Sequence, residues 1–198
     1  MRKEQKANYP ESARGAAALL VRMVLEDGAY TNIALNQYLR GSRLSDLDRR
    51  LATELVYGTV KASGTLDWYL AQCVSRPLDK VAGDILAILR ISTYQLLYMT
   101  RIPASAAVNE AVKLARSVSH EGSAKFVNGV LRGLLRKQEA GAFVLPDTEK
   151  QDADYLSLQY YHPRWLVKGW DRGDAAVPNA CWRLIIRLRR CACVLIRW

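Results

Sequence analysis

The chain has 198 residues, half of them hydrophobic, and carries a formal net charge of +10 at neutral pH. That length fits one domain, or one domain with part of another, and the positive excess favours a polyanionic partner, either nucleic acid or an anionic membrane surface. No apolar run reaches the roughly 18 residues that a membrane span needs. The charged start is not followed by the apolar core of a signal peptide. We therefore expect a cytoplasmic protein with no membrane partner.

Apolar residues recur at spacings of three and four from Glu11 to about Ala140, which predicts an all-α bundle of six or seven helices joined by short loops. Strand-like alternation is nearly absent from this region. The expected helices cover residues 11–26, 32–39, 45–61, 66–74, 78–99, 103–114 and 124–137.

Several local signals set these boundaries. Ser45 with Asp48 resembles a capping box that begins the third helix, and Ser63-Gly64 is expected to end it. Gly58 lies inside this helical pattern, which indicates a close helix crossing. The segment 78–99 is apolar on more than one face and should lie at the centre of the bundle. Residues 120–123 are expected to form a turn.

The sequence predicts no catalytic, cofactor-binding or metal-binding residue. None of the four cysteines forms a C-x-x-C pair, and the chain has only two histidines, which makes a zinc site improbable. Neither G-x-G-x-x-G nor a P-loop pattern occurs, and no nucleophile–base arrangement is evident. Asn109, Glu110 and Asn128 are expected to cap helices or to hold backbone groups.

Cations recur on and near the predicted helices. Lys125, Arg132 and Arg136 are spaced by seven and four residues, which places them on one helix face, as phosphate contacts require. The alternative is an ordinary solvated surface, which is favoured for any single residue but not for the set. The residues expected to contact RNA are Arg14, Arg49, Arg50, Lys61, Lys125, Arg132 and Arg136.

Three segments taken in order carry a family resemblance. Residues 55–61 read L-V-Y-G-T-V-K, residues 102–112 read I-P-A-S-A-A-V-N-E-A-V, and residues 125–132 read K-F-V-N-G-V-L-R. As a set they resemble the NusB-like helical domain, over roughly residues 10–138. The resemblance implies that residues 1–140 form a NusB-like, RNA-binding helical domain.

Two families use that domain, and the continuation of the chain favours one of them. NusB is a transcription antitermination factor that binds RNA and a ribosomal protein. In the RsmB (Sun/Fmu) family, the domain precedes a Rossmann-like domain that uses S-adenosylmethionine to methylate carbon 5 of a cytosine in small-subunit ribosomal RNA. Residues 141–170 are expected to be a linker and the start of a methyltransferase region, because 162–170 resemble the stretch leading into it. The resemblance thus implies that this chain is the N-terminal part of such a methyltransferase. In the intact enzyme the helical domain would position ribosomal RNA for the catalytic domain.

The alternative is a NusB-like antitermination module without enzymatic activity, which binds RNA and a ribosomal or transcription-complex protein. We expect a mostly monomeric chain. The apolar segment around Trp165 and Trp170, together with the run 184–186, would support weak dimerisation.

Residues 171–198 depart from the family. They lack the cofactor-binding glycine loop and the Pro-Cys and Thr-Cys motifs, so the chain alone is expected neither to bind S-adenosylmethionine nor to methylate. Residues 186–197 can be translated back into codons. When these codons are read one nucleotide earlier, the resulting amino-acid sequence resembles the family at this point. We therefore expect an aberrant tail from a frameshifted and truncated reading after about Trp170. Its six arginines and two aspartates contribute +4, which leaves +6 for the first 170 residues.

Overall fold

The computed structural model describes residues 8–143, 153–161, 164 and 167–168. The chain divides into two units, residues 1–143 and 144–198. Every regular element among the described residues is a helix, which confirms the all-α prediction. The elements are α1 (Ala13–Leu25), α2 (Thr31–Gly41), α3 (Asp46–Ala71), the 3₁₀ helix η1 (Leu78–Lys80), α4 (Gly83–Tyr98), α5 (Ala104–Val118), α6 (Glu121–Glu139) and α7 (Ala153–Tyr160).

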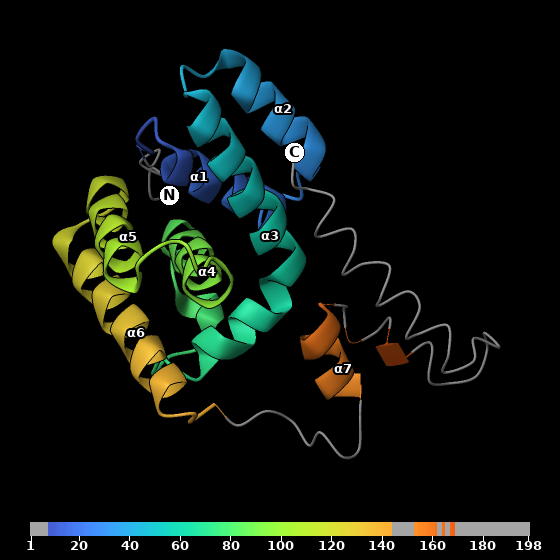
Figure 1. Cartoon of the computed structure of the whole chain (residues 1–198), viewed down its shortest axis with the longest axis vertical. Helices are drawn as coiled ribbons and strands as arrows, with labels where there is room; N and C mark the ends of the chain where they lie inside the picture. The colour runs from blue at the N-terminus through green and yellow to red at the C-terminus, as the bar shows by residue number, and fades with distance from the viewer. Residues whose placement is uncertain (1–7, 144–152, 162–163, 165–166, 169–198) are drawn as a thin grey trace, which may run out of the picture. The chain divides into compact units, whose positions relative to one another are not determined.

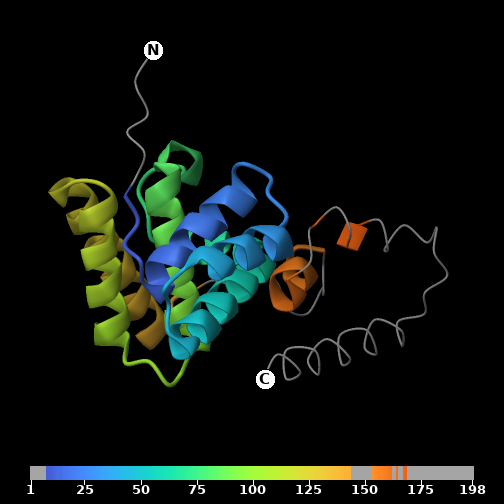
Figure 2. The same ribbon diagram turned by 90° about the horizontal axis from the view of Figure 1, so that it is seen from above.

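Helix α4 is the centre of the first unit. It contacts α1, α3, α5 and α6, with α1–α3 on one side of it and α5 and α6 on the other (Figures 1 and 2). Ile88, Leu89 and Ile91 are almost completely buried, which confirms the central position predicted from the all-round apolar pattern. The helix begins at Gly83 rather than at residue 78, because the chain first forms the separate turn η1.

The polar N-caps follow the sequence signals closely. Ser45 Oγ accepts from the Asp48 backbone amide, which confirms Ser45 as the N-cap of α3. The Asp48 carboxylate accepts from the Ser45 hydroxyl at 2.7 Å, whereas a capping box requires it to accept from the Ser45 backbone amide. Ser12 Oγ likewise accepts from the Gly15 amide and begins α1 at Ala13. The prediction that this helix begins at Glu11 was therefore wrong by two residues.

Two predicted interruptions are wrong. Helix α3 runs without a break through Ser63 and Gly64, because Ala62, Thr65 and Leu66 around them are buried and packing outweighs the weak helix propensity of Ser-Gly. The expected turn at 120–123 is the start of α6. His120 is its N-cap, and the ring Nδ1 accepts from the Ser123 amide at 3.3 Å.

Helices α3 and α4 are joined by a close approach and by an ion pair. The Tyr94 ring lies where a Cβ on Gly58 would be, which confirms the expected close crossing at this glycine. Arg90 donates two hydrogen bonds to the carboxylate of Asp67, at 2.7 and 2.8 Å. This bidentate geometry is the strong form of an arginine–carboxylate pair, so it fixes both the register and the rotation of the two helices.

A polar cluster joins the end of α1 to the start of α4. Tyr9 Oη donates to Asp84 at 2.6 Å, and Arg22 pairs with Asp84 at 3.2 Å and with Asp27 at 3.5 Å. Burial raises the pKa of Glu26 above its usual range, against the opposing effect of Arg22. The cluster holds the N-terminal segment on the bundle.

In the second unit, the described residues include α7, which lies within the stretch 141–170 expected to be a linker and the start of a methyltransferase region. Arg164 pairs with Asp154 of the same unit. Trp165, Trp170 and the predicted tail 171–198 lie outside the described residues. Among the helices that the structure describes, none has the length and hydropathy needed to cross a bilayer.

Candidate nucleic-acid interface

Helix α6 has one apolar face and one basic face. Val127, Leu131 and Leu134 are fully buried in the bundle. On the opposite side, Lys125, Arg132 and Arg136 are all exposed, which confirms that the periodicity separates the two faces. We call these three residues the α6 basic face. Arg132 Nε donates to Asn128 Oδ1 at 3.0 Å, one turn earlier on the helix.

Arg76 extends this basic face, and the sequence analysis missed it. It lies in the loop after α3, and its guanidinium carbon is 4.4 Å from the centroid of the Phe126 ring on α6. A cation over an aromatic face at this distance is held electrostatically. Phe126 follows Lys125 directly, so the contact adds a fourth cation beside the α6 basic face. The contact joins residues fifty positions apart and leaves no local signal in the sequence.

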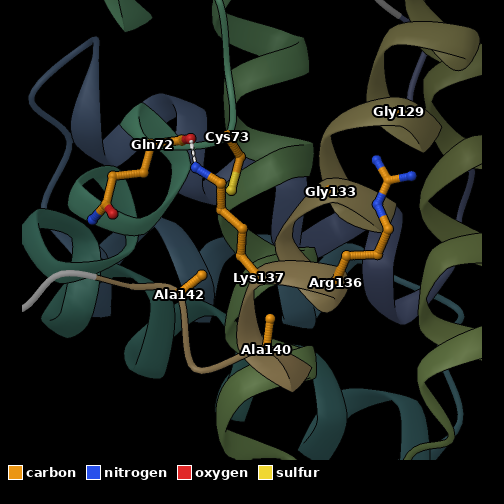
Figure 3. Close-up of a pocket in the computed structure, with 8 residues that line it drawn as sticks. All are labelled: Gln72, Cys73, Gly129, Gly133, Arg136, Lys137, Ala140 and Ala142. Carbon is orange, nitrogen blue, oxygen red and sulfur yellow. Dashed lines mark hydrogen bonds between the residues drawn. The ribbon is translucent and has the colours of Figure 1, made fainter.

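A shallow depression of about 340 Å³ lies where the end of α3 meets α6. We call it the α6 depression. It is lined by Gln72, Cys73, Gly129, Gly133, Arg136, Lys137, Ala140 and Ala142 (Figure 3). The side chain of Lys137 extends from α6 to the end of α3. There it donates a hydrogen bond to the backbone carbonyl of Gln72, which is the C-cap residue of α3. A cation at a helix C-terminus is favourable because the last carbonyls are unpaired and negative.

The chemistry of the α6 depression suits anion binding better than catalysis. Burial raises the pKa of the Cys73 thiol and outweighs the opposing effect of Lys137, so the thiol stays protonated at neutral pH and is a poor nucleophile. Within the described residues, no three His, Cys, Asp or Glu side chains gather as a metal site requires.

The described residues do not fit S-adenosylmethionine. They form no strand from which a glycine loop could lead into a helix, and the lining of the α6 depression includes no carboxylate for a ribose hydroxyl. We therefore assign no described residue to the binding of this cofactor.

Two of the residues predicted to contact RNA hold the domain together. Arg49 donates to the backbone carbonyls of Leu44 at 3.0 Å and Ser42 at 2.9 Å, which fixes the loop between α2 and α3. Arg14 Nε donates to the buried Oε1 of Gln95 on α4 at 2.9 Å. Both side chains are half-buried as well as hydrogen-bonded, whereas Arg132, which also has an intramolecular partner, is exposed.

The other predicted residues lie apart from the α6 basic face. Arg50 is exposed near the start of α3, and Lys61 is half-buried near its middle. At 1.5 Å per residue, Arg50 lies roughly 33 Å along the helix axis from Gln72, where α3 meets the α6 depression. The structure thus brings together Lys125, Arg132 and Arg136, with Arg76, but not all seven predicted residues.

The polar residues assigned structural roles make side-chain contacts. Asn128 holds Arg132, and Lys113 donates to Glu110 at 2.8 Å. This contact lowers the pKa of Glu110. These contacts are with side chains, not with the helix caps or backbone groups that the sequence led us to expect.

Comparison with known proteins identifies the first unit. Residues 11–136 match the NusB family. The chain is 40% identical over 172 residues to a Synechocystis protein named "Probable ribosomal RNA small subunit methyltransferase B", covering 86% of this chain and 38% of the relative. It is 34% identical over 181 residues to the Serratia proteamaculans ribosomal RNA small subunit methyltransferase B, covering 91% of this chain and 38% of the relative. The chain therefore spans under two fifths of these relatives.

Solved structures share the fold. NusB of T. maritima aligns with a TM-score of 0.59 at 21% identity, covering 68% of this chain and 98% of that chain. The antitermination factors NusB and NusE in complex with double-stranded RNA give a TM-score of 0.58 at 21% identity, covering 65% of this chain and 96% of that chain. At these identities the likeness establishes the helical fold.

Proposed function

The chain belongs to the NusB family over residues 11–136, and from this premise we propose that its helical domain binds RNA through the α6 basic face and Arg76. The observation that supports the proposal is the alignment of three exposed cations on one helix, with a fourth placed beside them by Phe126. A row of exposed cations can contact the phosphates of a nucleic-acid strand, and neutralising those phosphates releases the counterions condensed on them.

We propose further that the RNA is small-subunit ribosomal RNA, and that the domain positions it for cytosine-C5 methylation with S-adenosylmethionine by a catalytic region outside the described residues. The relatives named for this activity support the proposal, since the chain matches 38% of their length at up to 40% identity. We propose a cytoplasmic, mostly monomeric protein.

A binding experiment tests the proposal on the full chain. A fluorescein-labelled single-stranded RNA, titrated by anisotropy, should bind with an affinity that falls steeply as salt rises. Replacing Arg132 and Arg136 by alanine should weaken binding and lower the slope of log K against log salt by about 2, or about 1 for each lost phosphate contact.

The matched control is the double replacement of Arg40 and Lys113, which removes the same charge from exposed positions on α2 and α5. It should leave the slope within about 0.5 of the parent value if contacts on α6 carry the binding. Equal losses in the two variants would mean that net charge alone attracts RNA and would refute the interface. No binding at low salt would refute the function.

A second candidate is an antitermination module that binds RNA and a protein. It is supported by the match of residues 11–136 to the NusB family. A pull-down with ribosomal proteins, combined with the RNA titration, distinguishes the two. Retention of a ribosomal protein together with RNA binding would favour the second candidate, and RNA binding with no retained protein would favour the first.

A further inference from the structure

Two glycines on α6 have no explanation inside the domain. Gly129 and Gly133 lie one turn apart in the interior of the helix, where glycine is the least favourable residue other than proline. Gly58 on α3 is required because the Tyr94 ring occupies the place of its Cβ. A Cβ on Gly129 or on Gly133 would instead meet no atom within 4 Å. Neither has a positive φ, so the backbone does not require glycine either.

These glycines belong to the lining of the α6 depression. Figure 3 shows them on successive turns of α6, with the side chain of Arg136 lying alongside and that of Lys137 leading away to Gln72. Without side chains, the helix backbone is open to any group that enters the depression. Glycine is the usual residue where a backbone and a ligand must approach closely.

Positive charge lies on both sides of these glycines. At 100° per residue, Lys125, Arg132 and Arg136 lie on one side of the line through Gly129 and Gly133. Phe126 and Lys137 lie on the other side of this line, and the guanidinium of Arg76 lies over the Phe126 ring. Every charged side chain in the lining, Arg136 and Lys137, is a cation. The complementary occupant is therefore an extended polyanion that is thin enough to touch the helix backbone.

We infer that the sugar–phosphate backbone of a single RNA strand crosses α6 over Gly129 and Gly133, between Arg132 and Arg136 on one side and Arg76 on the other. The two glycines let a phosphate approach the helix more closely than any side chain would allow, so the flanking guanidiniums reach it directly. This inference rests on the proposed function and assigns the path of the strand on the α6 basic face.

The test separates RNA affinity from stability. Gly129→Ala and Gly133→Ala, singly and together, change no charge and replace glycine where the space is open. The variants should unfold at the same or a higher temperature than the parent chain, since alanine favours the helix. Yet their affinity for the labelled single-stranded RNA should fall about fivefold to tenfold at 0.1 M salt, roughly the contribution of one phosphate contact.

Gly64→Ala is the matched control. Gly64 is also a helix-interior glycine with no atom within 4 Å of its Cβ position, but it lies on α3 outside the α6 depression. Its replacement should raise stability and leave RNA affinity within twofold. If the double α6 variant binds RNA within twofold of the parent while the Arg132/Arg136 variant does not, the path over the glycines is refuted and the proposed function stands. If the parent chain binds no RNA, the proposed function itself fails.

Discussion

Tyr94 lies directly against Gly58: a Cβ on residue 58 would come within 2.1 Å of the ring Cζ and 2.3 Å of the hydroxyl. The two residues belong to α4 and α3, so the absence of a side chain on one helix sets how closely the other approaches. Tyr94 also packs against Tyr98 one turn later, with ring centroids 5.3 Å apart. A methyl group on residue 58 would therefore have to displace the Tyr94 ring.

Gly58→Ala should lower the free energy of unfolding by about 1–3 kcal/mol, because the added methyl overpacks the crossing and displaces the Tyr94 ring. Gly64→Ala on the same helix meets open space and should raise stability by up to about 1 kcal/mol. Urea unfolding followed by circular dichroism measures both. Similar effects of the two substitutions would contradict the close crossing.

Arg49 and Arg50 are neighbours with different environments. Arg49→Ala removes two hydrogen bonds to the carbonyls of Ser42 and Leu44, and should lower the free energy of unfolding by about 1–3 kcal/mol. Arg50→Ala, at an exposed position, should change it by no more than about 0.5 kcal/mol. Urea midpoints distinguish the two, and equal midpoints would mean that the Arg49 contacts contribute nothing in solution.

Ser45→Ala should destabilise the domain by about 1 kcal/mol, because it leaves the Asp48 amide at the start of α3 without its side-chain acceptor. Ser117 is a suitable comparison. Its hydroxyl donates to the Leu114 carbonyl within α5, and its replacement by alanine should change stability by less than about 0.5 kcal/mol. The thermal unfolding midpoint reports both, and a silent Ser45→Ala would rule out the cap.

Stability at alkaline pH should depend on Tyr9. Burial and the hydrogen bond to Asp84 raise the pKa of Tyr9 far above its usual value, which is near 10. A phenol with a raised folded-state pKa contributes stability that is fully present below about pH 10 and is lost as the pH rises further. Tyr9→Phe should cost about 1 kcal/mol at pH 8, and the difference from the parent should shrink between about pH 10 and 11.5. A constant difference would contradict the raised pKa.

The helix spacing made much of the fold predictable, since each stretch with apolar residues three and four apart became a helix. The errors occurred where tertiary contacts outweighed local preference. Ser63-Gly64 reads as a helix end, but the buried neighbours Ala62 and Leu66 carry α3 through it. His120 is not a preferred N-cap residue, and only its ring geometry shows that α6 begins there.

The candidate interface was predictable only in part. The spacing of Lys125, Arg132 and Arg136 along one helix is a local signal, and the structure keeps these residues on one exposed face. Arg14 and Arg49 have the same charge, but their partners lie on other elements or in a loop, which charge counting does not detect. Arg76 was missed for the converse reason, because its position depends on Phe126, fifty residues later.

The central position of α4 has a consequence for how the domain folds and unfolds. Helices α1–α3 precede it and α5–α6 follow it, yet both groups bury their apolar faces against it. A small cluster of Ala13, Ala16, Leu44 and Ala52 lies within the first group, but the main core joins both groups through Ile85, Ile88 and Leu89 of α4. We therefore expect a single cooperative transition, with no half of the bundle surviving alone. A break in the loop between α4 and α5 would leave two fragments that each need the other to fold.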